Sequence, residues 1–469
     1  MTNSPYDPGS FRDRTARVFY HNGSVFRGLN QHAWYEWERL RSTIFFGRAV
    51  DEGKIVATAQ ADPAELPKLV DDFEQRVLKH ETIPFVSYPY EWPFGMLKDA
   101  ALLQLELLAS ALEEDMILKD SSSFNVQWVG TRPVFIDIPS FRKLSEGEPW
   151  IGYRQFCQLF LYPLFLQAYK NIPFQTWLRG NLDGIEPEQC QQLMSFRDYF
   201  RRGVFSHVFL QAKAQSQFAH TNRDVRDDLR KAGFDVRLIK ANIKSLQALV
   251  ERLEWTKEKS TWSEYTSNNS YDSGDSGKKV SFVRDSIGSR NWQLVWDLGC
   301  NTGTFSQIAA ERARHVIALD ADQLAVERFY QTLKLRGSSK ILPLVCNIAD
   351  PSPNLGWRGL ERKELVKRGQ PDLVLCLALI HHLVLTANIP LEEFIGWLSD
   401  LGSNLIIEFI TKQDPMVRQL LRNKDDIYKD YEQEYFERCL SARFSIVRQE
   451  TFNSETRIIY HAVSKQPHQ

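Results

Sequence analysis

Short runs made mostly of apolar residues recur along the C-terminal part of the chain, and stretches with helical spacing separate them. Runs of this kind are typical of strands that are buried on both faces. They fall at residues 294–296, 315–319, 341–345, 371–380 and 404–409. Because strands that alternate with helices form parallel sheets, the pattern predicts an α/β, doubly wound, Rossmann-like sheet with helices on both faces.

The last two apolar segments have a different pattern. Residues 444–450 and 456–463 flank a polar turn at Asn453 and Ser454. Two strands around such a turn predict a terminal antiparallel hairpin, which would complete the sheet.

The N-terminal half mixes strand and helix patterns, which predicts an α+β, mostly helical domain. Residues 18–26 predict a β-hairpin, because Asn22 and Gly23 stand between two apolar segments. Helical spacing of apolar residues predicts helices at 63–79 and, over a stretch without proline or glycine, at 96–116. Two short strands are predicted next, at residues 126–128 and 134–138.

Composition changes between residues 255 and 290, which we therefore predict to be a polar linker or a lid over a site. The boundary divides the chain into an N-terminal α+β domain at 1–254 and a C-terminal sheet domain at 291–469. Within the first domain, residues 223–231 interleave arginine with aspartate, which is typical of a solvated helix face.

Composition and charge narrow the class of protein. At 469 residues, with 43% hydrophobic and 12% aromatic residues, the chain is expected to form two or three packed domains. The formal net charge of −1 gives no electrostatic reason to expect a nucleic-acid partner. The six cysteines are scattered, so neither a disulfide framework nor a metal site is predicted. Residues 1–13 contain no apolar signal segment, and the richest apolar stretch, 156–168, is too short to span a bilayer. We expect a cytoplasmic protein without a membrane partner.

A glycine-rich turn follows the first predicted strand of the C-terminal domain. Asp297 stands at the end of the strand, Gly299 and Gly303 bracket the turn, and a helix is expected from Phe305. Glycines let the backbone approach a ligand closely, and the free amides at the start of the helix point toward it. The spacing D-x-G-x-x-x-G differs from the dinucleotide fingerprint. The turn therefore predicts a site for another nucleotide-like ligand.

This turn resembles the first motif of the class I S-adenosylmethionine-dependent methyltransferases, in which it wraps the methionine and ribose portions of the cofactor. The order of strands and helices from residue 265 to the C-terminus also resembles that family. The resemblance implies S-adenosyl-L-methionine as the cofactor. It also implies cofactor contacts from the turn and from the next strand ends: Asp297, Gly299, Cys300, Asn301, Gly303, Phe305, Asp320, Asn347, Asp350 and Leu377.

Residues at two strand ends have specific expected roles. Asp320, after the second strand, can accept hydrogen bonds from both ribose hydroxyls. In the family a side chain after the third strand bonds the adenine amino group, and Asp350 is a closer match in type than Asn347. The sequences LALIHHL, from Leu377, and IEFIxKxDPMV, from Ile407, resemble more specifically a bacterial group of nodulation-type methyltransferases.

The motif identifies the methyl donor but not the acceptor, because catalysis needs mainly the alignment of nucleophile, methyl carbon and sulfur. A base is needed only where the acceptor must lose a proton. His381 and His382 follow the fourth strand. A histidine there can take that proton, or it can be a helix cap or a packed residue. Glu408 is a candidate base or an ion-pair partner, and these three residues form the candidate catalytic set.

The sequence excludes two known kinds of acceptor chemistry. The Pro-Cys pair of cytosine-C5 enzymes is absent, and so is the (Asp/Asn)-Pro-Pro-(Tyr/Phe) motif of amino-methylating nucleic-acid enzymes. We therefore predict a two-domain bacterial methyltransferase that acts on an oxygen or nitrogen, rather than a carbon, of an unidentified small molecule or protein. The N-terminal domain would recognise the acceptor.

A second resemblance lies in the N-terminal half. Asp120 and Asn125 follow a long predicted helix, and Asp137 ends the next apolar strand. This order resembles the catalytic loop of protein kinases and aminoglycoside phosphotransferases, in which such residues orient the acceptor and hold magnesium. Leu118 replaces the usual histidine of that loop, and Ile-Pro rather than Phe-Gly follows Asp137. Three alternatives stay open: a degenerate kinase-like scaffold, an ordinary loop cap, or a bifunctional ATP-binding protein.

A further alternative to the enzyme is a non-catalytic module that holds the cofactor or a partner. Tight cofactor binding without methyl transfer to any acceptor in a cell extract would favour that alternative.

Overall fold

The computed structural model describes residues 6–67, 73, 76–213, 235–257, 273–422 and 427–465. The chain divides into two compact units. The N-terminal unit comprises Met1–Trp128, Pro133–Thr256 and Leu355–Arg362, and the C-terminal unit comprises Val129–Arg132, Lys257–Asn354 and Lys363–Gln469. Each unit thus includes a short segment from the other half of the chain. The domain limits drawn from composition stay predictions.

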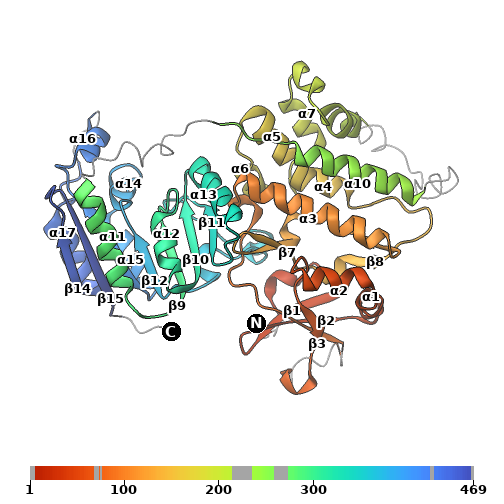
Figure 1. Cartoon of the computed structure of the whole chain (residues 1–469), viewed down its shortest axis with the longest axis horizontal. Helices are drawn as coiled ribbons and strands as arrows, with labels where there is room; N and C mark the ends of the chain where they lie inside the picture. The colour runs from red at the N-terminus through yellow and green to blue at the C-terminus, as the bar shows by residue number, and fades with distance from the viewer. Residues whose placement is uncertain are drawn as a thin grey trace. The chain divides into compact units, whose positions relative to one another are not determined.

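A seven-stranded sheet forms the centre of the C-terminal unit (Figure 1). Its order is β11-β10-β9-β12-β13-β15-β14, and β15 runs antiparallel to both of its neighbours. The remaining pairs are parallel, so the predicted parallel sheet with a terminal antiparallel hairpin is confirmed. The strands are β9 (Trp292–Leu298), β10 (Ala313–Asp320), β11 (Ile341–Val345), β12 (Leu373–Cys376), β13 (Asn404–Ile410), β14 (Phe444–Thr451) and β15 (Arg457–Ser464).

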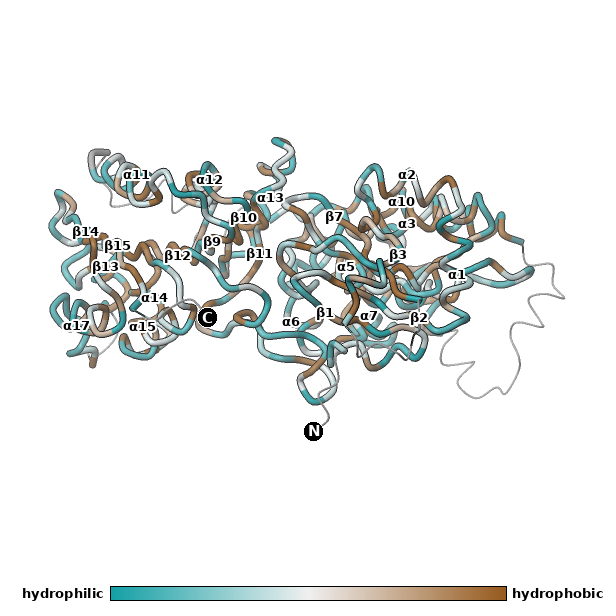
Figure 2. The backbone as a smooth tube through the Cα atoms, turned by 90° about the horizontal axis from the view of Figure 1, so that it is seen from below, coloured by the Kyte–Doolittle hydropathy of each residue, from teal (hydrophilic) through white to brown (hydrophobic). Residues whose placement is uncertain are grey.

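Helices cover both faces of this sheet, as Figure 2 shows. One face carries α11 (Ser273–Ile287), α12 (Thr304–Ala310) and α13 (Gln323–Leu335). The other carries α14 (Ile380–Leu385), α15 (Leu391–Asp400) and α17 (Gln433–Arg443), and α16 (Pro415–Leu421) follows β13. The chain winds outward from β9 to β11 and then returns to the other side of β9 at β12. Ligands of doubly wound sheets bind at such a reversal.

Within residues 255–290, which were predicted to be a polar linker or a lid, Ser273–Ile287 form helix α11. Its first turn is polar, but Asp275 is buried and accepts hydrogen bonds from the backbone amides of Asn453 and Ser454 at 2.9 and 3.3 Å. These partners lie in the β14–β15 turn, far away in the sequence. Residues 258–272 of the predicted linker lie outside the described residues, as does the predicted helix face at 223–231.

The N-terminal unit begins with an antiparallel sheet of order β1-β2-β4-β3. The predicted hairpin is confirmed: β1 (Ala16–His21) and β2 (Ser24–Leu29) meet at Asn22 and Gly23, whose φ angles are +47° and +73°. The helix predicted over 63–79 is wrong in its described part. There the structure forms a 3₁₀ turn at Pro63–Glu65 and then β4 (Val77–His80), which pairs with β2 and with β3 (Thr58–Gln60). Pairing with distant strands outweighs the local helical pattern.

Helices and short strands make up the rest of the N-terminal part of the chain. The predicted long helix is confirmed as α3 (Phe94–Leu112), although Met116 begins a strand instead of ending the helix. The first predicted short strand is confirmed as β6 (Val126–Val129). The second is confirmed only in part, because β7 (Arg132–Phe135) ends before Ile138, which begins a 3₁₀ turn. In the ranges that the structure describes, every helix is too short or too polar to cross a membrane. The other elements are α1 (Gln31–Arg41), α2 (Ile44–Asp51), β5 (Met116–Leu118), β8 (Phe141–Lys143), α4 (Tyr153–Phe156), α5 (Tyr162–Lys170), α6 (Gln175–Gly180), α7 (Pro187–Leu193) and α10 (Val236–Glu251).

Candidate functional site

A cavity of about 410 Å³ opens at the carboxyl ends of β9, β10, β11 and β12, where the strand order reverses. Nine of the residues singled out in the sequence line it: Asp297, Gly299, Cys300, Asn301, Phe305, Asp320, Asn347, Leu377 and His382. Four others do not line it: Gly303, Asp350, His381 and Glu408. The structure therefore brings the strand-end acids and most of the glycine turn together around one cavity, whereas two of the three candidate catalytic groups lie outside its lining. The roles of these residues stay predictions.

The glycine turn is held against the neighbouring strand. The amide of Gly299 donates to the carbonyl of Leu319 at 2.8 Å, and its φ angle of +75° favours glycine. Gly303 caps α12 with a φ angle of +81°. A Cβ atom on Gly303 would lie 1.9 Å from Cζ of Phe329, a buried residue of α13. Gly303 does not line the cavity. It allows the turn to pack closely against Phe329.

Asp297 presents a buried carboxylate to the cavity. Its side chain accepts a hydrogen bond from Oγ of Ser306 at 2.5 Å. Burial raises the pKa of Asp297 to about 6, and the nearby charge of Asp320 adds to the rise. Because burial disfavours the charged form of this carboxyl group, pairing with a cationic group of a ligand would stabilise the carboxylate.

Asp320 is fixed by two backbone amides. Oδ2 accepts from the amide of Asn301 at 2.7 Å, and Oδ1 accepts from the amide of Asp322 at 2.8 Å. Burial raises the pKa of Asp320 above its usual value. Each carboxylate oxygen has a second lone pair, so the oriented side chain can accept hydrogen bonds from ligand hydroxyls.

The end of β11 places Asn347 rather than Asp350 in the lining of the cavity. The side-chain oxygen of Asn347 accepts from the amide of Ala349 at 3.0 Å, which turns the chain so that Ile348 and Ala349 also line the cavity. This geometry favours Asn347, and the adenine contact of either residue stays a prediction.

The two histidines differ in position. His382 lines the cavity, and burial lowers its pKa to about 4, so that the ring is neutral near pH 7. His381 is buried outside the lining, and its Nδ1 has no hydrogen-bond partner among the described residues. Burial also lowers the pKa of His381 well below the usual value. This placement favours the packed interpretation for His381 and leaves His382 as the histidine that can contact a ligand.

Glu408 belongs to a buried ion cluster and not to the cavity wall. It contacts Nζ of Lys279 at 2.6 Å and the guanidinium of Arg457 at 3.7 Å, and Arg457 also contacts Asp414 at 2.7 Å. All four side chains are at most 5% exposed. Of the two interpretations of Glu408, the geometry favours the ion-pair partner.

Several other residues of the cavity wall were not predicted as site residues. Lys279 was hidden because its segment was predicted to be a linker or lid. Most of the others follow strand ends or lie on or next to α14. They line the cavity because of their place in the fold, and their residue types do not indicate a site. They are Thr302, Thr304, Ala321, Cys346, Ile348, Ala349, Ala378, Leu379, Leu383, Thr386 and Ala387.

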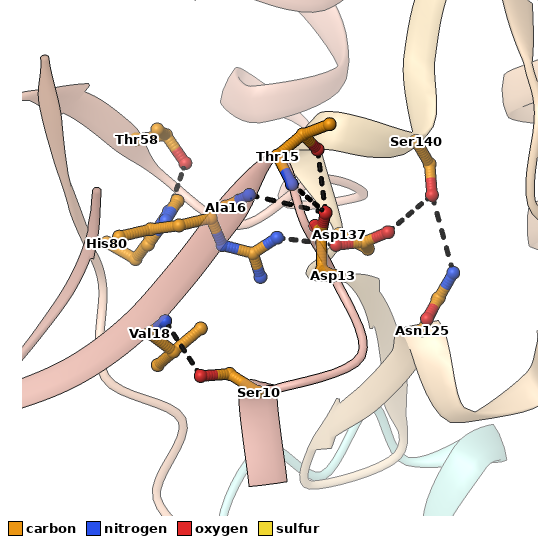
Figure 3. A network of polar contacts seen from close by, with 11 residues as sticks. Ser10, Asp13, Thr15, Ala16, Val18, Thr58, His80, Asn125, Asp137 and Ser140 are labelled. Carbon is orange, nitrogen blue, oxygen red and sulfur yellow. Dashed lines mark hydrogen bonds and ion pairs between the residues drawn. The ribbon is translucent and has the colours of Figure 1, made fainter. Parts of the chain in front are cut away.

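The kinase-like loop of the N-terminal unit has a different chemistry (Figure 3). Asp137 pairs with Arg27 at 2.5 Å and accepts a hydrogen bond from Ser140, which Figure 3 shows between Asp137 and Asn125. Burial opposes the charge of Asp137, but Arg27 and Ser140 outweigh it and lower the pKa. Burial raises the pKa of Asp120. No group of three or more His, Cys, Asp or Glu side chains in the described ranges could hold a metal ion. Asp137, which would bind magnesium in a kinase, is instead paired with the guanidinium of Arg27.

The strand order, the glycine turn and the acidic strand ends together define the class of protein: a class I S-adenosylmethionine-dependent methyltransferase. Nodulation protein NoeA of Rhizobium meliloti (strain 1021) is 34% identical over 454 residues, which cover 96% of this chain and 94% of that protein. The chain therefore belongs to the NoeA family.

Other comparisons cover only parts of the chain. An uncharacterised RNA methyltransferase of Clostridium tetani (strain Massachusetts / E88) is 43% identical over 58 residues, 12% of this chain and 13% of that protein. The solved N-methyltransferase NodS of Bradyrhizobium japonicum WM9 matches with 14% identity and a TM-score of 0.31, over 42% of this chain and 99% of that one. Magnesium protoporphyrin IX methyltransferase of Synechocystis PCC 6803 matches with 16% identity and a TM-score of 0.30, over 57% and 97%. No family model matches the chain.

Proposed function

We propose that the C-terminal unit transfers the methyl group of S-adenosylmethionine to an oxygen or nitrogen atom of a small-molecule or protein acceptor. The observation that carries this proposal is the cavity at the strand reversal, into which Asp297 and Asp320 project from two adjacent strand ends. The buried carboxylate of Asp297 with its raised pKa fits the ammonium of a methionine portion. Asp320 fits the ribose hydroxyls, and Asn347 and Ala349 border the space for adenine.

The residues of the chain mainly bind and orient in this mechanism. The bound sulfonium supplies an activated methyl group, so alignment of the acceptor atom with it contributes most of the catalysis. His382, neutral near pH 7, can accept a hydrogen bond or a proton from an acceptor oxygen or nitrogen. Burial raises the pKa of the Cys300 thiol in the cavity wall well above its usual value. A protonated thiol is a poor nucleophile, which supports acceptors other than those activated by cysteine attack.

The N-terminal unit is proposed to recognise the acceptor. Its kinase-like loop has Asp137 paired with Arg27, and this pairing supports a degenerate scaffold over active phosphotransfer. The cytoplasmic location expected from the sequence stays a prediction.

Calorimetric titration with S-adenosylmethionine and S-adenosylhomocysteine tests the proposed donor. We expect micromolar binding by the wild type and a loss of at least about tenfold in Asp297→Asn, because a charge-assisted contact to a buried carboxylate is removed. Asp350→Asn, the same substitution at a residue outside the cavity lining, should bind within about twofold of the wild type. No binding by the wild type would overturn the proposal. Binding without transfer of labelled methyl to any acceptor in a cell extract would identify a binding module instead.

The charge of Asp297 should also make binding depend on pH. Because its pKa is about 6, the affinity for S-adenosylmethionine should fall by up to about tenfold per pH unit below pH 6. The stability of the ligand-free protein should change in the opposite direction. A carboxyl whose pKa is raised by folding stabilises the fold below its unfolded pKa, and that contribution is lost as pH rises through about 6. The loss is about 3 kcal/mol for a shift of this size.

Calorimetry at pH 5, 6 and 7 measures the first effect, and urea unfolding from about pH 4 to pH 7 measures the second, because the loss of stability occurs between the unfolded and the folded pKa. In Asp297→Asn both pH dependences should flatten, and the ligand-free protein should be more stable at pH 7 than the wild type. An unchanged pH dependence in this variant would assign the titration to another group.

A further inference from the structure

We propose that residues 196–210 of the N-terminal unit bind the surface of an anionic lipid bilayer. These residues include a 3₁₀ helix at Phe196–Phe200 and a π-helix at Phe205–Phe209, both of which follow α7 in the chain (Figure 1). The segment belongs to the N-terminal unit and contributes no residue to the lining of the cavity at the strand reversal. The inference is therefore independent of the proposed methyl transfer.

Aromatic side chains of this segment form one continuous row, which we call the aromatic strip. Each ring contacts the next in the order Phe200, Phe196, Tyr199, Phe209 and Phe205, with centroid distances of 5.6, 6.3, 5.5 and 5.5 Å. Such distances are typical of aromatic pairs that stabilise one another. The rings therefore form a single apolar surface and are not isolated side chains.

Both ends of the aromatic strip are exposed to solvent. Phe196 is 75% exposed and Phe200 is 80% exposed. At the other end Phe205 is 52% exposed, and Leu210, directly after the π-helix, is 46% exposed. Single exposed apolar residues are common, but a contiguous exposed group is typical of an interaction site. Because the outer rings protrude from the unit, they can enter the boundary between headgroups and acyl chains without a matching pocket in the partner.

The charges beside the aromatic strip are positive. Arg197, Arg201 and Arg202 are exposed, and Asp198 is the one acidic residue in the sequence from 196 to 210. Asp198 is buried, and its carboxylate pairs with Nζ of Lys170 at 2.7 Å and with Nε of Arg201 at 3.1 Å. Lys170 offsets the charge of Asp198, so the arginines leave a surplus of positive charge at the surface. Anionic phospholipids supply the complementary charge.

Buried neighbours hold the aromatic strip on the unit. Val204 and Val208 are fully buried, and the ring Nδ1 of His207 contacts the hydroxyl of Tyr153 at 2.7 Å. The carbonyl of His207 accepts a hydrogen bond from the hydroxyl of Tyr162 at 2.7 Å. The π-helix that carries these residues is a rare conformation that often occurs at functional sites. The exposed rings thus lie on a fixed scaffold, which lowers the entropy cost of binding.

The geometry favours a lipid surface over other partners. The ring of Phe196 is inclined by 84° to that of Phe200 and by 88° to that of Tyr199, so these rings form no flat platform for successive nucleic-acid bases. A second copy of the strip would bring arginines against arginines, which disfavours self-association. Every described helix is too short or too polar to span a membrane, but peripheral binding needs no spanning helix. The proposal therefore departs from the expectation of no membrane partner, which rested on the lack of a spanning segment.

Flotation of the full-length chain with vesicles tests the inference. The wild type should bind vesicles of phosphatidylcholine mixed with phosphatidylglycerol, and bind phosphatidylcholine vesicles at least about tenfold more weakly. Phe196→Ser/Phe200→Ser should lower the partition coefficient for the mixed vesicles at least about tenfold, because two apolar side chains no longer enter the bilayer. Arg197→Gln/Arg202→Gln should lower it about twentyfold at low ionic strength and remove most of its salt dependence.

Exposed residues outside the segment provide matched controls. Ile44 is 80% exposed on α2, and Arg14 is exposed near the start of the chain. Ile44→Ser and Arg14→Gln should bind the mixed vesicles within about twofold of the wild type. All of these variants should keep the wild-type midpoint of urea unfolding, since the replaced side chains are exposed.

The possible outcomes decide the inference without reference to the methyl donor. A wild type that does not bind the mixed vesicles at low ionic strength overturns it, and so does vesicle binding that the strip variants leave unchanged. Polyuridylate binding that the strip variants abolish, without vesicle binding, would assign the strip to nucleic acid. Self-association that they abolish would assign it to an interface between copies. Both results would overturn the inference, whereas loss of S-adenosylmethionine binding alone would contradict the proposed function.

Discussion

Gly303→Ala should destabilise the C-terminal unit by about 2–5 kcal/mol and abolish cofactor binding in the fraction that unfolds. The φ angle of Gly303 is +81°, and an L-residue in this region costs about 1–2 kcal/mol. The added Cβ would lie 1.9 Å from Cζ of Phe329, so the buried ring or the turn must move. Overpacking of this kind costs a further 1–3 kcal/mol or so. The midpoint of urea unfolding of the full-length chain measures the loss.

Gly299→Ala is the matched control, because it changes the other glycine of the same turn. Its φ angle of +75° carries a similar conformational cost, but the new Cβ would lie 3.4 Å from Cδ1 of Leu379, an ordinary contact. We expect a loss of about 1–2 kcal/mol there. Phe329→Leu, combined with Gly303→Ala, should recover part of the larger loss, as a double-mutant cycle would show. Equal destabilisation by the two glycine substitutions would contradict the role assigned to Phe329.

The sequence predicted those features of the C-terminal unit that local patterns determine. Apolar runs identified the parallel strands, and Asp297 and Asp320 were found because each directly follows one of these runs, at the carboxyl end of its strand. The carboxyl ends of parallel strands meet at one edge of a sheet, so the topology places Asp297 and Asp320 close together. The same reasoning could not choose between Asn347 and Asp350, because a turn of three residues decides which of them faces the cavity.

Features that depend on distant partners were missed. Lys279 pairs with Glu408, 129 residues further along the chain, and Asp275 of the same helix caps a turn near residue 453. These partners cannot be read from the local sequence, and the polar residues of α11 alone resemble those of a linker in composition. The kinase-like loop shows the same limit, since the order of its elements was predicted but the pairing of Asp137 with Arg27, 110 residues away, was not.

The buried ion cluster predicts the second large effect, on stability rather than on catalysis. Glu408→Gln keeps the shape of the side chain and removes one of the two negative charges that balance Lys279 and Arg457. Removal of one partner from a buried ion pair costs about 3–5 kcal/mol, because the remaining charge stays desolvated. We expect a loss of this size in urea unfolding. At a temperature where the variant is folded, its rate of methyl transfer per folded molecule at saturating donor should stay close to that of the wild type.

Glu311→Gln provides the matched control for the charge itself. Glu311 pairs with Arg284 at 3.1 Å, but both side chains are 52% exposed, and exposed pairs contribute about 0–1 kcal/mol. The double variant Glu408→Gln/Lys279→Met restores the balance of buried charge, so it should be more stable than Glu408→Gln alone. If Glu408→Gln instead unfolds like the wild type but transfers methyl groups much more slowly, Glu408 acts as a base. In that case the ion cluster would be part of the catalytic machinery and not only a support for the fold.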